Sequence, residues 1–568
     1  MDLTTEQKEL IEETVTNKPG TYGCQSCAGS GKSFTIFKAI DYIKEHEPDA
    51  KILYLVFNKA NQLEAQQKLM KYAGWEVPVD VKTAHSFAHN KWTSIFGPFT
   101  AITSLQWNLI QQVTSTYYDP EIKWTKKAPF VWLHDQFCST NMGLDTFVKS
   151  IYAMWEDDYT GLDKPKEYEI IGPRGKRQKK FGIYVNAYSV VTRAHVDAFK
   201  EIYELHTKNQ LFTHSMYLKH AALSTKSGGS KYDYVFFDEA QDANKMMLRL
   251  LEKQDVTKTY FIGDERQSIY KFDGSNENVF LTKHFDKLYH LSRSFRFGNN
   301  IANLAQKIIK LNSDHIVTGT EQTHAIRPNS KAYLFRTNAK LFESMLDFAY
   351  SNKLRGDRIR INLMKANEDE SAYLEILAFL GLYYRHTNYK YYAEHQNIFP
   401  KELPTSLTQF NKRFNEDRTL TFEDIYNEQY DGLSDDIHSI YAYAKGQKNF
   451  IEKYIALQEA INDIHATQEI TAITMHRSKG LEWDDVIIAE PSKLYYADRE
   501  GTVKRNPNYM QEMNLMYVAV TRARKRLNAL AFAADLKNES PSLFENETML
   551  VKEGKTIEPA SVQGDTNG

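Results

Sequence analysis

Short runs of apolar, β-branched and aromatic residues alternate with longer amphipathic stretches along the chain. The clearest runs read KILYLVF (51–57), YDYVFF (232–237), KTYFIG (258–263), KAYLFR (331–336) and DDVIIA (484–489). Strands that are apolar on both faces and separated by helical segments are typical of parallel sheets covered by helices on both sides. Because the pattern occurs in both halves of the chain, it predicts two α/β domains.

Two stretches rich in Tyr, Lys and Glu interrupt this alternation, and we interpret them as helical insertions, one in each α/β domain. The basic segment GPRGKRQKK (172–180) in the first insertion is a solvated surface turn, a nucleic-acid contact or, as a third alternative, a nuclear-localisation signal. The predicted order is a first α/β domain at 1–90 and 215–285 with its insertion at 91–214, a second α/β domain at 286–345 and 465–535 with its insertion at 346–464, and a polar, disordered tail at 536–568.

The composition limits the compartment and the partners. With 42% hydrophobic and 25% charged residues, the chain is typical of a soluble globular protein, and no apolar run approaches the ~20 residues of a membrane span. The first residues, MDLTTEQKEL, lack the basic-then-apolar layout of a secretory signal, so we expect a cytoplasmic protein, or a nuclear one in a eukaryote. The formal net charge is −2, so any nucleic-acid binding must come from a local groove.

The segment GCQSCAGSGKSFT (23–35) carries two overlapping signatures. Cys24 and Cys27 have the C-x-x-C spacing of a redox dithiol or half a zinc site, whereas the glycines and the Lys-Ser pair after them fit a phosphate loop. The third cysteine, Cys138, is far away in sequence, and a zinc site would need more ligands nearby. We therefore favour the phosphate loop, and expect alkylation of Cys27 to inhibit ATP hydrolysis and bound ATP to protect the thiol.

The phosphate-loop pattern is met at its last three positions, while Ser26 occupies the first glycine position. Glycines in such a loop let successive backbone N–H groups turn towards phosphate oxygens, and the following helix points its positive N-terminus at them. Lys32 would neutralise the β and γ phosphates of ATP, and the Ser33 hydroxyl would be a ligand of Mg2+. The predicted loop contacts are Ala28, Gly29, Ser30, Gly31, Lys32 and Ser33.

A carboxylate partner for this loop follows the apolar run in YDYVFFDEAQD (232–242). Asp238 can hold Mg2+, directly or through water, and Glu239 can act as general base on the attacking water. The separation of Ser33 and Asp238, 238 − 33 = 205 residues, is far more than one crossover helix requires. A whole domain must be inserted there, which is atypical of small phosphate-loop kinases and GTPases.

Read in order, the motifs from residue 4 to residue 527 resemble those of superfamily 1A DNA helicases of the UvrD/Rep type, and FNKA and SFRFG most resemble the F-box DNA helicase branch. The resemblance implies an α/β fold with two RecA-like parallel-sheet phosphate-loop domains and ATP between them. It also implies an ATP- and Mg2+-dependent translocase that moves 3′ to 5′ on single-stranded DNA and unwinds duplex at a single-strand/double-strand junction, coupling hydrolysis to stepping.

Other functions are compatible with parts of the sequence. One is a translocase that mainly strips proteins or recombinase filaments from DNA, with a recombinase or a single-strand binding protein as a possible partner. A nuclease-fused helicase is disfavoured, because about 40 residues follow the last motif. A non-catalytic, nucleotide-gated scaffold would require a damaged site, yet every catalytic position of the family is filled.

The resemblance assigns nucleotide contacts outside the phosphate loop. TTEQKELI (4–11) resembles the motif whose glutamine reads the adenine edge, which is Gln7 here, and GDERQSIYKF (263–272) contains the γ-phosphate sensor Gln267. LSRSFRFG (291–298) would place Phe295 against adenine and Arg296 on the γ-phosphate.

Two further nucleotide contacts lie near the end of the chain. TAITMHRSKGLEWDDVII (471–488) implies that Glu482 lies near the ribose, and NLMYVAVTRARKRL (514–527) implies that Arg522 is a second arginine finger. Two arginines that follow the γ-phosphate would close the cleft when ATP is bound and release it after hydrolysis.

The resemblance also assigns contacts to single-stranded DNA. VFNKA (56–60) and KTAHSF (82–87) resemble strand-contacting motifs, and stacking of a base on an aromatic ring is worth about 1 to 3 kcal/mol without reading the base. In isolation, each aromatic or histidine side chain has core packing as its alternative. The predicted contacts are Phe57, Asn58, Thr83, His85, Phe87, Phe272 and His476.

Overall fold

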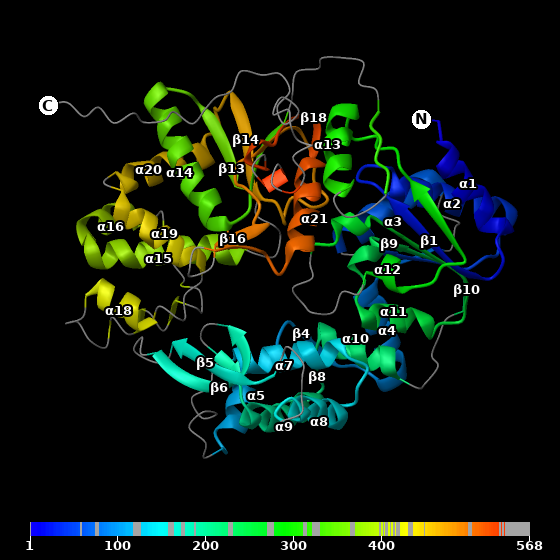
Figure 1. Ribbon diagram of the computed structural model, residues 1–568, viewed down its shortest axis with the longest axis horizontal. Helices are drawn as coiled ribbons and strands as arrows, with labels where there is room; N and C mark the ends of the chain where they lie inside the picture. The colour runs from blue at the N-terminus through cyan, green and yellow to red at the C-terminus, as the bar shows by residue number, and fades with distance from the viewer. Residues whose placement is uncertain are drawn as a thin grey trace. The chain divides into compact units, whose positions relative to one another are not determined.

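The structure is a computed structural model in which the chain forms two compact units, Met1–Leu291 and Ser292–Gly568 (Figure 1). It describes residues 2–56, 59–73, 79–117, 127–156, 164–171, 177–186, 189–224, 231–269, 278–310, 315–320, 330–363, 370–396, 421–429, 435–447, 449–497 and 502–532, with short segments at 399–400, 403, 407–408, 411–412, 415, 535–536 and 539. Each unit is described by itself.

The first unit is built on a six-stranded, fully parallel sheet. Its strands are, in spatial order, β11 (Lys287–Leu291), β1 (Gly20–Ser26), β10 (Val256–Gly263), β9 (Tyr232–Asp238), β2 (Ile52–Val56) and β3 (Val79–Thr83). All residues of β2 are buried, as the unbroken apolar run predicts for a strand covered on both faces.

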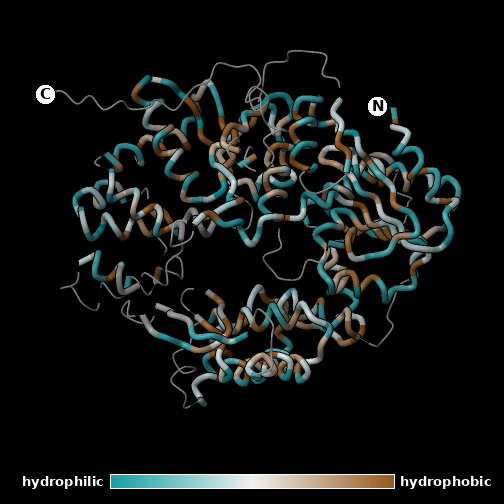
Figure 2. Tube along the Cα trace, viewed as in Figure 1, coloured by the Kyte–Doolittle hydropathy of each residue, from teal (hydrophilic) through white to brown (hydrophobic). Residues whose placement is uncertain are grey.

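Helices cover the two faces of this sheet. Alternate strand residues such as Tyr54 and Phe236 pack with α1 (Thr5–Thr16), α2 (Lys32–His46) and α3 (Lys59–Ala73), and their neighbours Leu55 and Phe237 pack with α4 (Ala84–Phe96), α10 (His214–Leu223) and α11 (Lys245–Glu252). Short elements connect them: η2 (Ala240–Asp242), η3 (Glu265–Gln267) and α12 (Val279–Thr282). Figure 2 shows hydrophobic and hydrophilic segments alternating along the helices, as one buried face requires.

The insertion of the first unit is only partly helical, which corrects the predicted all-helical insertion. It contains α5 (Trp107–Thr114), α7 (Ala128–Ser139), α8 (Leu144–Ala153) and α9 (Arg193–Lys208). It also contains an antiparallel sheet of β5 (Lys166–Ile171), β6 (Arg177–Asn186) and β7 (Ser189–Val191), and the pair β4 (Thr100–Ile102) and β8 (Leu211–Thr213). Part of the basic segment, residues 172–176, lies outside the described residues.

The second unit is built on a five-stranded parallel sheet in the order β13 (Ile359–Leu363), β14 (Gln468–Thr474), β12 (Lys331–Phe335), β15 (Trp483–Ile488) and β18 (Ala523–Asn528). The other elements that accompany it are α13 (Asn299–Lys310), α14 (Asn338–Arg355), α20 (Phe450–Asn462), α21 (Tyr509–Val520), η7 (Leu530–Phe532) and the hairpin of β16 (Tyr495–Ala497) and β17 (Val503–Arg505).

Two predicted boundaries differ from the structure. β11 pairs with β1, so the first α/β domain extends to Leu291 and does not end at residue 285. β13 belongs to the second sheet, so residues 346–363 are part of that domain, and the helices α15 (Glu370–Thr387), α16 (Tyr389–His395), α18 (Phe422–Gln429) and α19 (Asp435–Gly446) come after it.

The predicted tail lies largely outside the described residues, but its beginning is in contact with the second unit. Leu536 is fully buried, and the Glu539 carboxylate pairs with the Arg505 guanidinium at 3.4 Å. Within the described ranges, no helix is both long and apolar enough to cross a bilayer.

Candidate nucleotide site

The loop between β1 and α2 has the backbone geometry of an anion-binding turn. Gly29 and Gly31 have φ angles of 74° and 79°, a left-handed region that glycine adopts without steric cost. Gly31 is the N-cap of the 15-residue helix α2 and provides no side-chain cap for its first turn. Since the first N–H groups of a helix and its dipole attract anions, this loop can hold phosphate.

An unsatisfied hydroxyl in the loop supports the same conclusion. The Ser30 side chain is 2% exposed, and its Oγ has no hydrogen-bond partner among the described residues. A buried polar group without a partner costs about 1 to 3 kcal/mol, and a phosphate oxygen or a water molecule at this loop would remove that cost. The loop therefore fits the nucleotide that its sequence predicts.

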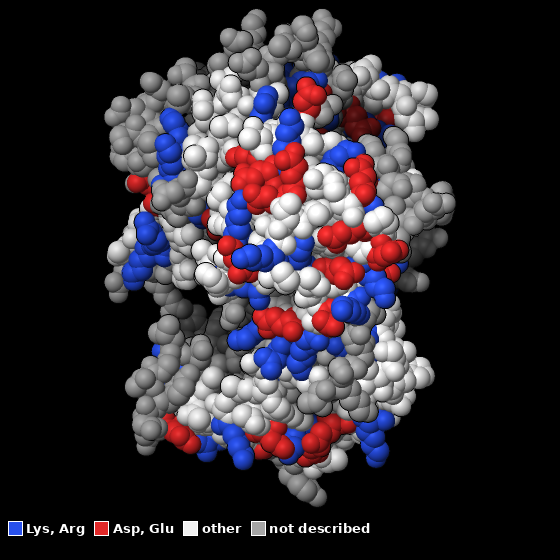
Figure 3. All heavy atoms as spheres, turned by 90° about the vertical axis from the view of Figure 1, so that its right-hand side faces the viewer, with Lys and Arg blue, Asp and Glu red and all other residues white. Residues whose placement is uncertain are grey.

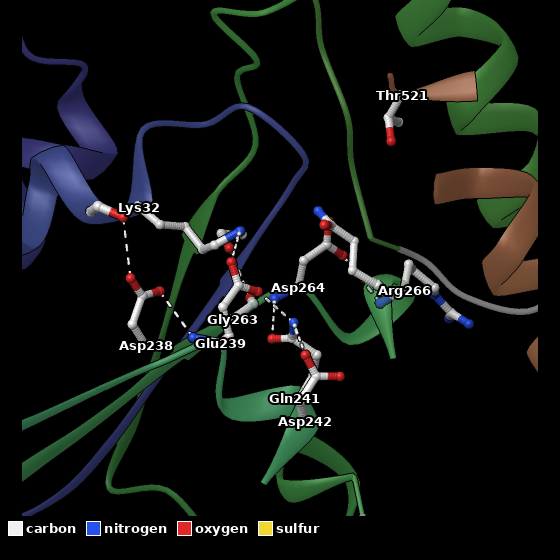
Figure 4. Close-up of polar contacts among 12 residues, drawn as sticks. Lys32, Asp238, Glu239, Gln241, Asp242, Gly263, Asp264, Arg266 and Thr521 are labelled. Carbon is white, nitrogen blue, oxygen red and sulfur yellow. Dashed lines mark hydrogen bonds and ion pairs between the residues drawn. The ribbon is translucent and has the colours of Figure 1, made fainter. Parts of the chain in front are cut away.

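Figure 4 shows how α2 and the end of β9 bring the predicted catalytic groups together. The Ser33 hydroxyl donates to Asp238 Oδ2 at 3.1 Å, and Lys32 Nζ lies 3.6 Å from Glu239 Oε1. A hydroxyl and a carboxylate oxygen are ligand types that Mg2+ accepts beside phosphate oxygens. The residues present thus fit both the magnesium ion and the phosphates that the sequence predicts.

Asp238 is held in a low-dielectric position by its neighbours. Its carboxylate accepts a hydrogen bond from Tyr54 Oη at 2.8 Å, a contact that sequence reasoning missed because Tyr54 lies on a different strand, β2. Burial, followed by repulsion from the Glu239 carboxylate, raises the pKa of Asp238, and the nearby Lys32 ammonium opposes this shift. A bound divalent cation would favour the ionised carboxylate.

Glu239 has an unusual backbone conformation. Its φ is 53°, and only Gln210 shares a positive φ among the described non-glycine residues. The left-handed conformation costs an L-residue about 1 to 2 kcal/mol, and such strain concentrates at functional sites. The side chain of Gln241, which sequence reasoning also missed, donates to Glu239 Oε2 at 2.6 Å.

The two predicted residues that flank the phosphate loop are both buried in hydrogen-bond networks. Gln267 on η3 is 5% exposed and donates from Nε2 to Asp264 Oδ2 at 2.7 Å. Gln7 is 2% exposed, and its Nε2 donates to Thr35 Oγ1 at 3.1 Å and to the Ser30 carbonyl at 3.4 Å. Gln7 therefore connects α1 to the phosphate loop, a supporting role that the predicted adenine contact did not include.

The two predicted arginine fingers lie together in the second unit, around Thr521 at the end of α21. Arg296 donates from Nε to Glu482 Oε2 at 2.6 Å and from Nη1 to the Thr521 carbonyl at 3.1 Å. Arg522 is fully buried and donates from Nη2 to Thr521 Oγ1 at 3.1 Å. Two backbone carbonyls complete the shell of Arg522: those of Val518, at 2.9 Å from Nε, and Leu481, at 3.1 Å from Nη1.

The phosphate loop, the carboxylate pair and the clustered arginines indicate a nucleotide-driven motor, and comparison with known families decides which one. The UvrD/REP helicase N-terminal domain family matches residues 3–287, and the UvrD-like helicase C-terminal domain family matches residues 384–532. The chain belongs to the UvrD/REP helicase family. This membership confirms the predicted fold of two RecA-like α/β domains.

Individual relatives of this UvrD/REP chain are longer proteins. F-box DNA helicase protein 1 of Schizosaccharomyces pombe is 24% identical over 561 residues, which cover 92% of this chain and 57% of the relative. F-box DNA helicase 1 of Gallus gallus is 25% identical and covers 92% of this chain and 48% of the relative. The chain thus spans about half the length of these two relatives. An ATP-dependent helicase/nuclease of Syntrophomonas wolfei is 26% identical over 207 residues, 32% of this chain and 16% of the relative.

The remaining nucleotide contacts implied for a UvrD/REP protein have mixed surroundings. Phe295 is half-buried, and the Arg293 guanidinium lies 5.8 Å from its ring centroid. The Glu482 side chain is 40% exposed, and its carboxylate contacts Arg296 and, at 3.5 Å, Arg524. In this structure Glu482 therefore pairs with arginines, and a ribose contact would have to share or replace these pairs.

The predicted DNA contacts fall into three groups, of which the first lies outside the described residues: Phe57, Asn58 and Phe272. Phe87 is 6% exposed and belongs to the core beneath α4, which corrects its predicted stacking role because no ring face is open to a base. Thr83 is 9% exposed and caps α4 by accepting the Ser86 N–H at 3.0 Å, so its hydroxyl is already used.

The two histidines of the third group are neutral at physiological pH. Burial, together with the nearby His214, lowers the pKa of His85 to about 4, and its Nδ1 has no hydrogen-bond partner among the described residues. Burial and the Arg336 guanidinium lower the pKa of His476 to about 4. Both can therefore offer a hydrogen bond to DNA but no positive charge. On the face shown in Figure 3, basic and acidic side chains are interspersed.

Proposed function

We propose that this chain is a single-stranded-DNA-dependent ATPase and a helicase that moves 3′ to 5′ and unwinds duplex DNA. The observation that carries the proposal is the meeting of Lys32, Ser33, Asp238 and Glu239 at the ends of β1 and β9. Membership in the UvrD/REP family supports the DNA substrate. The polarity rests on the resemblance of the motifs alone.

The first unit supplies the groups for hydrolysis. Water attacks the γ-phosphorus of ATP, Glu239 accepts the proton from that water, and the bond between the γ-phosphorus and the β–γ bridging oxygen breaks to leave ADP and phosphate. Lys32 neutralises the phosphate oxygens on which charge gathers. Mg2+, held by Ser33 and Asp238, would supply electrostatic stabilisation of those same oxygens.

The second unit supplies positive charge. We propose that Arg296 and Arg522 act on the γ-phosphate, because a guanidinium placed on a transferring phosphoryl group accelerates its transfer by about 10³- to 10⁵-fold. Loss of the γ-phosphate then removes the charge that attracts both arginines. Repeated gain and loss of this attraction would drive stepping along a DNA strand.

The test is steady-state ATP hydrolysis by the purified full chain with and without single-stranded DNA, followed by strand displacement on 3′- and 5′-tailed duplexes. We expect a low basal rate, strong stimulation by DNA and unwinding only of the 3′-tailed duplex. A rate that DNA leaves unchanged would refute the DNA-dependent motor. Stimulation without unwinding, combined with displacement of a recombinase filament, would favour the stripping translocase instead.

A further inference from the structure

Gln241 occupies a buried position between two parts of the candidate site, and neither the family resemblance nor the sequence gives it a role. It lies on η2, two residues after Glu239, and is fully buried. Its Nε2 donates to Glu239 Oε2 at 2.6 Å, and its Oε1 accepts the Asp264 backbone N–H at 3.0 Å. Both ends of the carboxamide thus have a defined partner (Figure 4).

The chemistry of these two partners requires a carboxamide in this orientation. An ionised carboxylate only accepts hydrogen bonds, and a backbone N–H only donates them. A side chain that joins Glu239 to the Asp264 backbone must therefore carry a donor at one end and an acceptor at the other. Glutamate lacks the donor at neutral pH, and leucine or methionine lacks both.

The backbone leaves space for this contact. A Cβ atom added at Gly263 would come within 2.2 Å of Gln241 Oε1, so only glycine at the end of β10 permits the amide to lie there. Nε2 of Gln241 is also 3.4 Å from Asp242 Oδ2, a longer contact than its bond to Glu239. The amide is thus fixed by its surroundings and directed mainly at the Glu239 carboxylate.

The contacts continue from Asp264 to the predicted γ-phosphate sensor. The Asp264 side chain is 1% exposed and accepts from Gln267 Nε2 at 2.7 Å and from the Arg266 backbone N–H at 3.1 Å. A continuous hydrogen-bonded path therefore runs from Glu239 through Gln241 and Asp264 to Gln267. All of its members belong to the first unit.

We propose that Gln241 is a positioning residue that holds the Glu239 carboxylate for proton abstraction and makes its orientation depend on Gln267. This inference rests on the proposed ATPase function. Glu239 needs such support because its left-handed backbone is strained, and Lys32 contacts only the other carboxylate oxygen, Oε1, at 3.6 Å. A γ-phosphate contact that moves Gln267 would reach the base through this path.

The test replaces the amide with an apolar group of the same length, Gln241→Met, in the full chain. Because a hydrogen bond to a charged group is lost, we expect kcat of the DNA-stimulated ATPase to fall about 10- to 100-fold. The KM for ATP and the affinity for a fluorescent ATP analogue should change less than about threefold, since Gln241 is not a predicted ligand of the nucleotide. If this variant does not fold, Gln241→Asn keeps the amide one methylene short and should give the same loss of kcat.

Gln254 provides a matched control in the same unit. It is also a buried glutamine, 8% exposed, and its Nε2 donates only to the Leu250 carbonyl in the described part of the chain, at 2.5 Å. Gln254→Met should lower the melting temperature as much as Gln241→Met does and leave kcat within twofold of wild type. If the kcat of Gln241→Met also stays within twofold, or falls only together with nucleotide affinity, the positioning role is wrong.

A double-mutant cycle tests the path to Gln267. If Gln241 and Gln267 act through one path, the double variant Gln241→Met/Gln267→Met should lose at least threefold less kcat than the product of the two single losses. Multiplicative losses would refute the coupling. A wild-type chain that does not hydrolyse ATP would refute the proposed function itself, whereas an active wild type with an equally active Gln241→Met would refute only this inference.

Discussion

The two units share one architecture but differ in the chemistry of their connecting loops. Each has a parallel sheet covered by helices. In the first unit, the groups at the ends of β1 and β9 are one ammonium, one hydroxyl and two carboxylates. In the second, the groups around the end of α21 are two guanidinium groups, Arg296 and Arg522, held mostly by backbone carbonyls. The same fold therefore carries different functions through its loops.

The difference lies also in how completely each cluster is satisfied. Ser30 Oγ in the first unit is buried without a partner in the described structure, whereas Arg522 in the second unit has an acceptor for each of its three nitrogens. A cluster with unused capacity can receive a ligand, and a saturated cluster must exchange partners to do so. We infer that nucleotide binds the first unit first, and that Arg296, whose partner Glu482 is 40% exposed, exchanges more readily than Arg522.

The largest effect should come from the first unit. Lys32→Ala removes the charge that neutralises the phosphates and should abolish measurable hydrolysis, a loss of more than about a thousandfold in kcat. Glu239→Gln keeps the shape of the side chain but cannot accept a proton, so it should bind ATP with near wild-type affinity and not turn it over. Hydrolysis rates and binding of a fluorescent ATP analogue distinguish the two, and activity that survives both substitutions would mean that the site is misplaced.

The second unit should show a division between chemistry and stability. Arg296→Ala should lower kcat by about a thousandfold, as for a lost arginine finger, and change the melting temperature little, because one of its two contacts is a partly exposed ion pair. Arg522→Ala should lower kcat and also cost about 3 kcal/mol or more of stability, because it leaves buried carbonyls without donors.

Arg526→Ala is the matched control for both arginines. Arg526 pairs with Asp485 at 2.7 Å, is 44% exposed and belongs to β18, so its loss should change kcat less than twofold. Calorimetry and ATPase rates on the three variants decide the matter. If Arg522→Ala were fully stable, the buried shell around its guanidinium would not be an important part of the fold.

The sequence predicted local features of these sites and missed those that depend on distant pairing. The phosphate loop and the Asp238–Glu239 pair were identifiable because each follows an apolar run and has a fixed spacing. The role of β11 was missed because its partner β1 lies more than 250 residues earlier in the chain, with Tyr22 opposite Lys287. Parallel pairing over such a distance leaves no local pattern.

Side-chain surroundings were harder to predict than strands. The aromatic character of Phe87 fits a stacking surface and a core equally well, and only the packing of α4 on the sheet decides for the core. Gln241 was visible in the motif DEAQD, but its bond to Glu239 depends on the left-handed backbone at Glu239, which no residue type there indicates. Residue identity restricts the chemistry, whereas burial and backbone angles select which part of it is used.

A smaller effect should come from Thr521, which contacts both arginines. Thr521→Val keeps the shape and the carbonyl that accepts from Arg296 but removes the hydroxyl that accepts from Arg522. Loss of one hydrogen bond to a charged group should lower kcat about tenfold. Thr521→Ser restores the hydroxyl and should restore most of the rate, which a purely steric role for the threonine methyl group would not explain.

The smallest effect is expected at the cysteines, where the structure reverses the expectation from sequence. Cys27 lies in the phosphate loop, but its side chain is 0% exposed, and burial raises the pKa of its thiol well above the ordinary value. Burial does the same to the pKa of Cys24, and neither cysteine forms a disulfide. Because the thiolate is the reactive form, neither thiol should react readily with a soluble alkylating agent.

We therefore expect iodoacetamide at neutral pH to leave both thiols of the native chain unmodified, with ATPase activity unchanged and no protection by ATP to observe. Mass spectrometry should find both cysteines alkylated only after denaturation. Rapid alkylation of Cys27 that ATP prevents would show that the loop opens far enough to expose a thiol that packs against β11, whose Leu291 carbonyl accepts the Cys27 N–H at 2.9 Å. The first unit would then share with the second the need to rearrange before it acts on nucleotide.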